Sequence, residues 1–118
     1  MKNLEQVRAK NALEASLDGP ISGKNEGEVI KKIPPLIINH GLLAIGAYAF
    51  SNDAYRKVID AIVNHLACEE IKLVPEYVRN TATFMEYLCT EADSNKLRLI
   101  TSETMAWLNY ARRFIKKG

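Results

Sequence analysis

Hydrophobic and polar residues alternate along this chain at the spacing of α-helices, most clearly near its end. Residues 101–117, TSETMAWLNYARRFIKK, place a broad apolar arc on one side of a helix at about 100° per residue. A helix on the surface of a core needs an apolar stripe of about 100°, whereas this arc covers well over half the circumference. We therefore predict that other elements contact this helix on two sides, and that Trp107, Tyr110 and Phe114 lie in the core.

Similar periodicity predicts several more helices. They cover residues 3–17, 29–40, 42–50, 53–67 and 75–91, followed by a short helical run at 95–100. The short run either continues into the helix at 101–117 or hinges at Thr101. Asn3 and the stretch 51–53 supply capping side chains, and Pro75 fits the first position of the helix that it begins.

Prolines and a glycine indicate where the helices are interrupted. Pro34 and Pro35 lack the amide donor that a helix needs, so we expect a kink or a break there. Gly41 is expected to end this element, and residues 42–50 are expected to form a second short helix. Because apolar residues occur on all sides of 42–50, we expect this short helix to be buried.

These elements together define the fold class. The stretch 71–74 alternates too briefly to decide between strand and coil, and no other stretch has a convincing strand pattern. A chain of 118 residues, 47% of them hydrophobic, suffices for one core. We therefore predict an all-α fold, a compact single-domain bundle of five to six helices over residues 1–118.

Two features bear on the location of the protein. The longest apolar run, residues 42–50, is much shorter than the ~20 residues that cross a bilayer. Residues 1–4 lead into a charged helix, whereas a secretory leader would continue into an apolar segment. These features favour a cytoplasmic protein without membrane contact.

Few residues offer catalytic or metal-binding chemistry. His40 falls on the apolar face of its helix and His65 near the edge of another, so packing or surface roles explain both better than a nucleophilic triad. Cys68 and Cys89 match no paired-ligand spacing of a zinc site, and we expect buried, reduced thiols. We therefore predict no enzyme activity, no metal site and no cofactor.

Positive residues form clusters, although the formal net charge at pH 7 is only +2. Lys31 and Lys32 lie opposite the apolar face of their helix, and Arg112 and Arg113 lie at a helix C-terminus, where cations complement the helix dipole. The residue pattern alone favours solvated surface charge. Contact with the phosphates of a nucleic acid is the other interpretation, and it stays open.

Three stretches of the chain resemble one family of helical proteins. They are LEQVRAK at residues 4–10, KIPPLI at 32–37 followed by Asn39-His40-Gly41-Leu42, and TSETMAWLNYARRF at 101–114. Together they are similar to the small helical subunit of the Cmr complex, the type III-B CRISPR effector in which guide RNA directs cleavage of target RNA. The resemblance implies a noncatalytic structural subunit in antiviral defence that stacks beside the backbone subunits.

The resemblance also implies partners and a contact surface. The implied partners are the other Cmr effector subunits, the guide and target RNA, and further copies of the same chain. A positive surface would face the target RNA, and the residues that we assign to it are Arg8, Lys10, Lys31, Lys32, Arg112, Arg113 and Lys116. The alternative is a helical protein–protein adaptor with no nucleic-acid contact, whose basic clusters are solvated.

Overall fold

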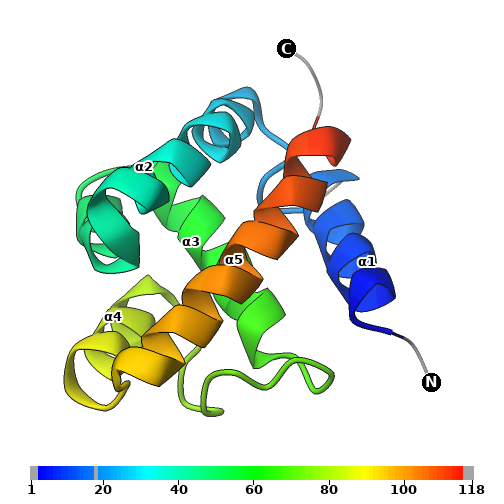
Figure 1. Ribbon diagram of the computed structural model, residues 1–118. Coiled ribbons are helices and arrows are strands. Elements are labelled where there is room, and N and C mark those ends of the chain that lie inside the picture. Colours follow the sequence, from blue (N-terminus) through cyan, green and yellow to red (C-terminus); the bar gives the residue numbers. More distant parts are fainter. Residues whose placement is uncertain (1–2, 18, 116–118) are drawn as a thin grey trace.

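Five α-helices make up the part of the chain that the structure describes. The structure is a computed structural model, and it describes residues 3–17 and 19–115. Its helices are α1 (Leu4–Leu17), α2 (Lys24–Ala49), α3 (Asp53–Ala67), α4 (Thr81–Thr90) and α5 (Ser94–Phe114), with no strand among these residues. The predicted all-α fold class is therefore confirmed (Figure 1).

Side-chain caps determine where four of the helices begin. Asn3, Asn52, Asn80 and Asp93 each accept a hydrogen bond from the backbone N–H three residues further on. Such a bond satisfies one of the amide donors that have no partner inside the helix. The caps predicted at Asn3 and within 51–53 are thereby confirmed.

The prediction that a helix begins at Pro75 is wrong. The segment 68–80 consists of turns and irregular backbone, and α4 begins only at Thr81. The reason is the capping box at this point, in which Asn80 accepts from the Thr83 amide while the Thr83 hydroxyl bonds to the Asn80 backbone. Two satisfied bonds at the N-terminus outweigh the weaker preference of proline for a first helical position.

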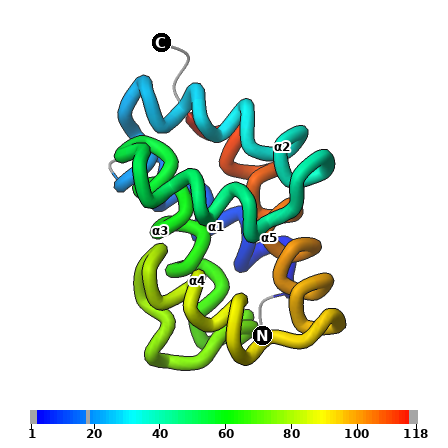
Figure 2. Tube along the Cα trace, turned by 90° about the vertical axis from the view of Figure 1, so that its left-hand side faces the viewer, coloured from blue at the N-terminus to red at the C-terminus, as the bar shows by residue number. Residues whose placement is uncertain are grey.

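The helices pack around a crossing of α3 and α5. In Figure 1, α5 runs diagonally in front of α3, with α1 on one side and with α2 and α4 on the other. Helix α1 packs mainly against α5, and α2 packs mainly against α3. Figure 2 shows the same bundle after a quarter turn, with α2 above α4. The molecule measures 39 × 38 × 24 Å.

Helix α5 is the core element that the sequence predicts. The side chains of Ile100, Trp107 and Leu108 are completely buried, while Tyr110 and Phe114 are partly buried against the core. The helix is continuous from residue 94 to residue 114, so the short run before Thr101 continues into it without a hinge. The assignment of Trp107 to the core is confirmed.

The predicted interruption of α2 at Pro34 and Pro35 is wrong. Both prolines lie inside the helix, and their backbone keeps helical angles. Each proline withholds one amide donor from the helix, but Ile33 and Ile37 on either side are buried and hold this segment against the core. Packing therefore maintains the helix through a position that local preference disfavours.

The backbone of α2 breaks at Gly41 instead. Its φ of 83° and ψ of 162° lie in a region that is essentially open only to glycine. This agrees with the prediction that Gly41 ends one element and that a second short helix follows.

The second segment of α2, residues 42–49, is not buried on all sides as predicted. Leu42 and Ile45 face the core, but Tyr48 is 53% exposed, and Leu43 and Phe50 are exposed as well. The core covers this segment on one side only, which leaves an apolar face in solvent.

No single helix among the described residues is long and apolar enough to span a bilayer. Helices α2 and α3 meet the criterion of length and composition only as a pair, bent by 110°.

The backbone conformation of Gly41 predicts that substitution of this glycine destabilises the protein. Gly41→Ala should lower the free energy of unfolding by about 1–3 kcal/mol because an L-residue is strained at this φ and ψ. Steric contact is excluded as the cause, since no atom lies within 4 Å of the added Cβ. Chemical denaturation measures the change. Asn39→Ala, at an exposed helical position of the same segment, is the control, and an equal loss there would refute strain at Gly41.

Candidate nucleic-acid interface

Four of the predicted contact residues gather at one end of the bundle. Lys31 and Lys32 are exposed on the first half of α2, and Arg112 and Arg113 are exposed in the last turn of α5. These two segments lie at the same end of the molecule in both views (Figures 1 and 2). None of the four forms an ion pair with a carboxylate of residues 3–17 or 19–115. We call these four residues the basic end.

Lys10 and Lys116 are not counted in this group. The Lys10 side chain is 53% exposed on α1, and its ammonium lies 4.0 Å from a Glu14 carboxylate oxygen, which offsets part of its charge. Lys116 lies outside the described residues. The basic end therefore stands on Lys31, Lys32, Arg112 and Arg113.

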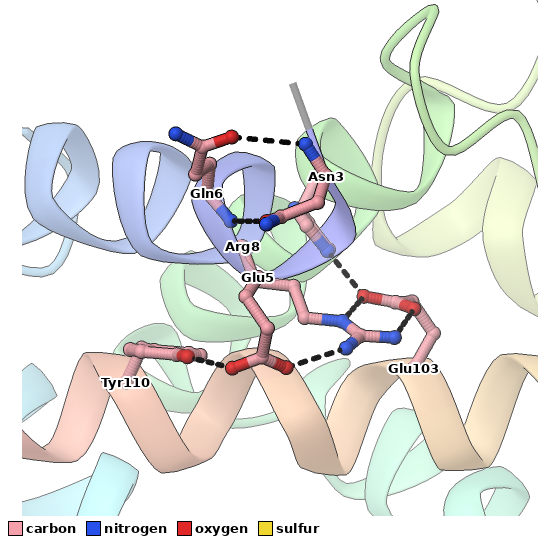
Figure 3. A network of polar contacts seen from close by, with 7 residues as sticks. Asn3, Glu5, Gln6, Arg8, Glu103 and Tyr110 are labelled. Atoms are coloured by element: carbon pink, nitrogen blue, oxygen red, sulfur yellow. Dashed lines mark hydrogen bonds and ion pairs between the residues drawn. The ribbon is translucent and has the colours of Figure 1, made fainter. Parts of the chain in front are cut away.

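Arg8 is partly buried between α1 and α5, with its side chain 19% exposed, and it is bound by two carboxylates. Its Nε and Nη2 donate to the two oxygens of Glu103, each at 2.7 Å, and its Nη1 donates to Glu5 at 3.0 Å (Figure 3). Glu5 also accepts a hydrogen bond from the Tyr110 hydroxyl. The bond to Glu103 raises the pKa of the Arg8 guanidinium further above its ordinary value. Arg8 thus joins α1 to α5 and has few donors left for a phosphate.

Glu103 also binds a buried histidine. His65 on α3 is 2% exposed, and its Nε2 lies 2.9 Å from the second Glu103 oxygen. The amide nitrogen of Asn11 donates to His65 Nδ1 at 2.9 Å, so Nδ1 is the acceptor and Nε2 carries the proton. The imidazole is therefore neutral and donates to Glu103.

Burial and hydrogen bonding shift both titrations in this cluster. Burial lowers the pKa of His65 below 6.5, and the attraction of Glu103 offsets this only in part. Burial alone would raise the pKa of the Glu103 carboxyl, but hydrogen bonds from Arg8 and His65 outweigh it and hold that pKa below 4.5. The folded protein thus keeps Glu103 charged and His65 neutral.

The polar cluster accounts for the position of α1. This helix has little amphipathic character, and its buried residues are only Val7, Ala12 and Ser16. The cluster supplies what a hydrophobic stripe would otherwise supply, because it ties α1 to α5 through Arg8 and to α3 through Asn11. Asn11 also approaches the Cys68 sulfur at 3.5 Å.

Sequence reasoning missed this cluster. It placed Arg8 on an outer surface, left His65 at a helix edge and gave Glu103 no role. One feature of the sequence could have indicated the cluster. The apolar side chains within residues 4–17 form no stripe, and a helix without an apolar stripe must be held by other contacts. The partner 95 residues away could not be read from the pattern.

The other residues considered for catalysis or metal binding form no site among the described residues. His40 is exposed, so it does not pack in the core as its position on the apolar face suggested. Cys68 is partly exposed and Cys89 is exposed, both as free thiols, so the expectation of buried cysteines is wrong. Among the described residues, no three His, Cys, Asp or Glu side chains are grouped as a metal site would require.

Arg8 is bound by one buried and one exposed carboxylate, and replacing each in turn compares their contributions to stability. Glu103→Ala should cost about 3 kcal/mol of unfolding free energy because it leaves Arg8 and His65 without their partner in a largely buried site. Glu5→Ala removes the 64% exposed carboxylate from the same arginine and should cost much less. Denaturant titration compares the two variants, and equal losses would contradict the importance of the buried contact.

The neutral state of His65 predicts acid sensitivity. The unfolded chain takes up a proton at this imidazole near pH 6.5, whereas the folded chain does so only at lower pH. Between these two values the unfolded state binds more protons, so stability should fall as the pH drops below 6.5. The lowered pKa of Glu103 adds a further loss below pH 4.5. Thermal melting from pH 7 to pH 5 tests the first effect. His65→Gln should flatten the decline over that range, and an unchanged slope would refute its origin in His65.

Comparison with known proteins places the chain in a family. No curated protein and no solved structure gives a significant match to it. The family model described as CRISPR-associated protein (Cas_Cmr5) matches residues 4–117, which include the helices α1 to α5 and the basic end. The chain therefore belongs to the Cas_Cmr5 family of CRISPR-associated proteins and is a small subunit of the type III-B Cmr complex.

Proposed function

We propose that this chain is a noncatalytic structural subunit of the RNA-guided Cmr effector in antiviral defence, and that its basic end contacts the target RNA. The observation that carries this proposal is that two segments about 80 residues apart in the chain bring four exposed cations to the same end of the bundle, none of them paired with a described carboxylate. Binding to the phosphate backbone of RNA needs such cations, and it needs no side chains that recognise individual bases.

The arrangement of the basic end supports contact with a strand and not with a small anion. Its cations belong to two separate helices, so they offer several points of contact spread over one end of the bundle. Lys10 on α1 is a further proposed contact outside the basic end, and Lys116 lies outside the described residues. We leave Arg8 out of the contact surface because Glu103 and Glu5 already occupy its guanidinium.

A second surface supports packing against other subunits. Leu13 and Leu17, one helical turn apart on α1, are 40% and 51% exposed, although this helix packs on α5. In Figure 1 this helix lies on the side of the bundle opposite α2. The leucines favour a contact with a neighbouring subunit, either a backbone subunit or a further copy of this chain, stacked along the effector. The same observation is what a purely protein-binding adaptor would need.

Charge reversal at the basic end distinguishes the RNA contact from the adaptor. In the assembled complex, Arg112→Glu with Arg113→Glu should weaken binding of target RNA about tenfold or more. The slope of log affinity against log salt concentration, roughly −3 for four phosphate contacts on a single strand, should become shallower by about 1.4. Filter binding at several salt concentrations measures both quantities.

The matched control for this experiment is Arg98→Glu, an exposed charge in the second turn of the same helix. It should leave RNA affinity and salt slope unchanged. If the double variant assembles normally and binds RNA with unaltered affinity, the basic end does not contact RNA and the adaptor function takes its place.

A further inference from the structure

A groove opens where α2 breaks at Gly41. It has a volume of about 330 Å³, and its lining residues are Leu36, His40, Ala44, Ile45, Tyr48 and Tyr55. The first two precede the break, the next three follow it, and Tyr55 belongs to the first turn of α3. The groove thus depends on the glycine conformation that turns the second segment of α2 away from the first.

An aromatic ring forms an exposed wall of this groove. Tyr48 is 53% exposed, whereas Tyr55 beneath it is only 9% exposed. The two rings meet edge to face, with centroids 4.6 Å apart and an interplanar angle of 77°. This contact fixes the orientation of the Tyr48 ring while about half of its surface remains open to a ligand.

The charge around the groove favours a polyanion with a flat apolar part. No Asp, Glu, Lys or Arg occurs from residue 33 to residue 52, so α2 contributes no carboxylate to the groove. Lys32 lies one helical turn before Leu36, at a rise of about 6 Å, and it also belongs to the basic end. On the other side, Arg56 directly follows Tyr55, although Asp53 pairs with it. Lys32, a residue of the basic end, therefore lies about one helical turn along α2 from the groove.

We propose that this groove binds one base of single-stranded RNA, with Tyr48 as the stacking surface and Lys32 contacting a neighbouring phosphate. This inference rests on the proposed contact between the basic end and target RNA, and it names where a base is held. In proteins that bind single-stranded nucleic acid, bases stack on aromatic side chains beside a positively charged groove, largely without sequence preference. The exposed Ile38 and Leu43, which would favour an aliphatic protein partner, do not line the groove.

Tryptophan fluorescence provides a direct test. Trp107 is the only tryptophan of the chain and is completely buried. Tyr48→Trp therefore adds a solvent-exposed indole, whose fluorescence can be distinguished from that of Trp107. A short oligouridylate should quench the added indole, whereas an abasic oligonucleotide of equal length should not. In the assembled complex, Tyr48→Leu should weaken target RNA binding about tenfold, and Tyr48→Phe, which keeps the ring, should not. Tyr48 is exposed enough for these variants to fold, and thermal melting verifies it.

The outcomes separate this inference from the proposed function. If RNA binds with the expected salt dependence but neither quenches the indole nor responds to Tyr48→Leu, the stacking site is refuted and the phosphate contact stands. If the isolated chain binds no RNA, and if its variants do not change RNA binding by the complex, both the phosphate contact and the stacking site are refuted. If the other subunits quench the indole without RNA, the groove is a protein contact and the stacking site is refuted.

Discussion

The ion pair between Arg8 and Glu103 is the contact on which the arrangement of the bundle depends. Helix α1 has almost no apolar stripe, so burial of hydrophobic surface alone does not define its orientation. Two parallel hydrogen bonds between a guanidinium and a carboxylate are directional, and they fix both the distance and the rotation of α1 relative to α5. His65 then connects the same carboxylate to α3, so three helices meet at one side chain.

This use of charge inside the bundle bears on the charge outside it. Buried ion pairs often contribute less to stability than apolar residues of similar volume, because both ions lose their hydration. We interpret their advantage here as specificity, since the bonds that join Arg8, Glu103 and His65 are directional. An arginine that serves this purpose is not free to bind phosphate, which leaves the outer cations of α2 and α5 as the groups that a nucleic acid would meet.

Much of the fold could be predicted from sequence because it depends on local signals. The breadth of the apolar arc identified α5 as the core helix, and Asn3, Asn52 and Gly41 marked ends of helical segments correctly. Predictions failed where distant contacts override local preference. Ile33 and Ile37 hold α2 helical across two prolines, and a capping box displaces the start of α4 from Pro75 to Thr81. The side that a short apolar helix exposes is likewise decided by its neighbours, as residues 42–49 show.

The site was predictable only in part, for the same reason. Exposure of Lys31 and Lys32 follows from their position opposite an apolar face, which is a local property. The inward position of Arg8 follows from a carboxylate 95 residues away, and helical periodicity carries no information about such a partner. That separation also affects how the chain folds during synthesis. Helix α1 is synthesised before α5, and Glu103 follows Arg8 by 95 residues, so α1 must wait without its docking surface. A helix whose inward face is polar and charged tolerates water during this delay, and it is less prone to associate wrongly than a strongly apolar one would be.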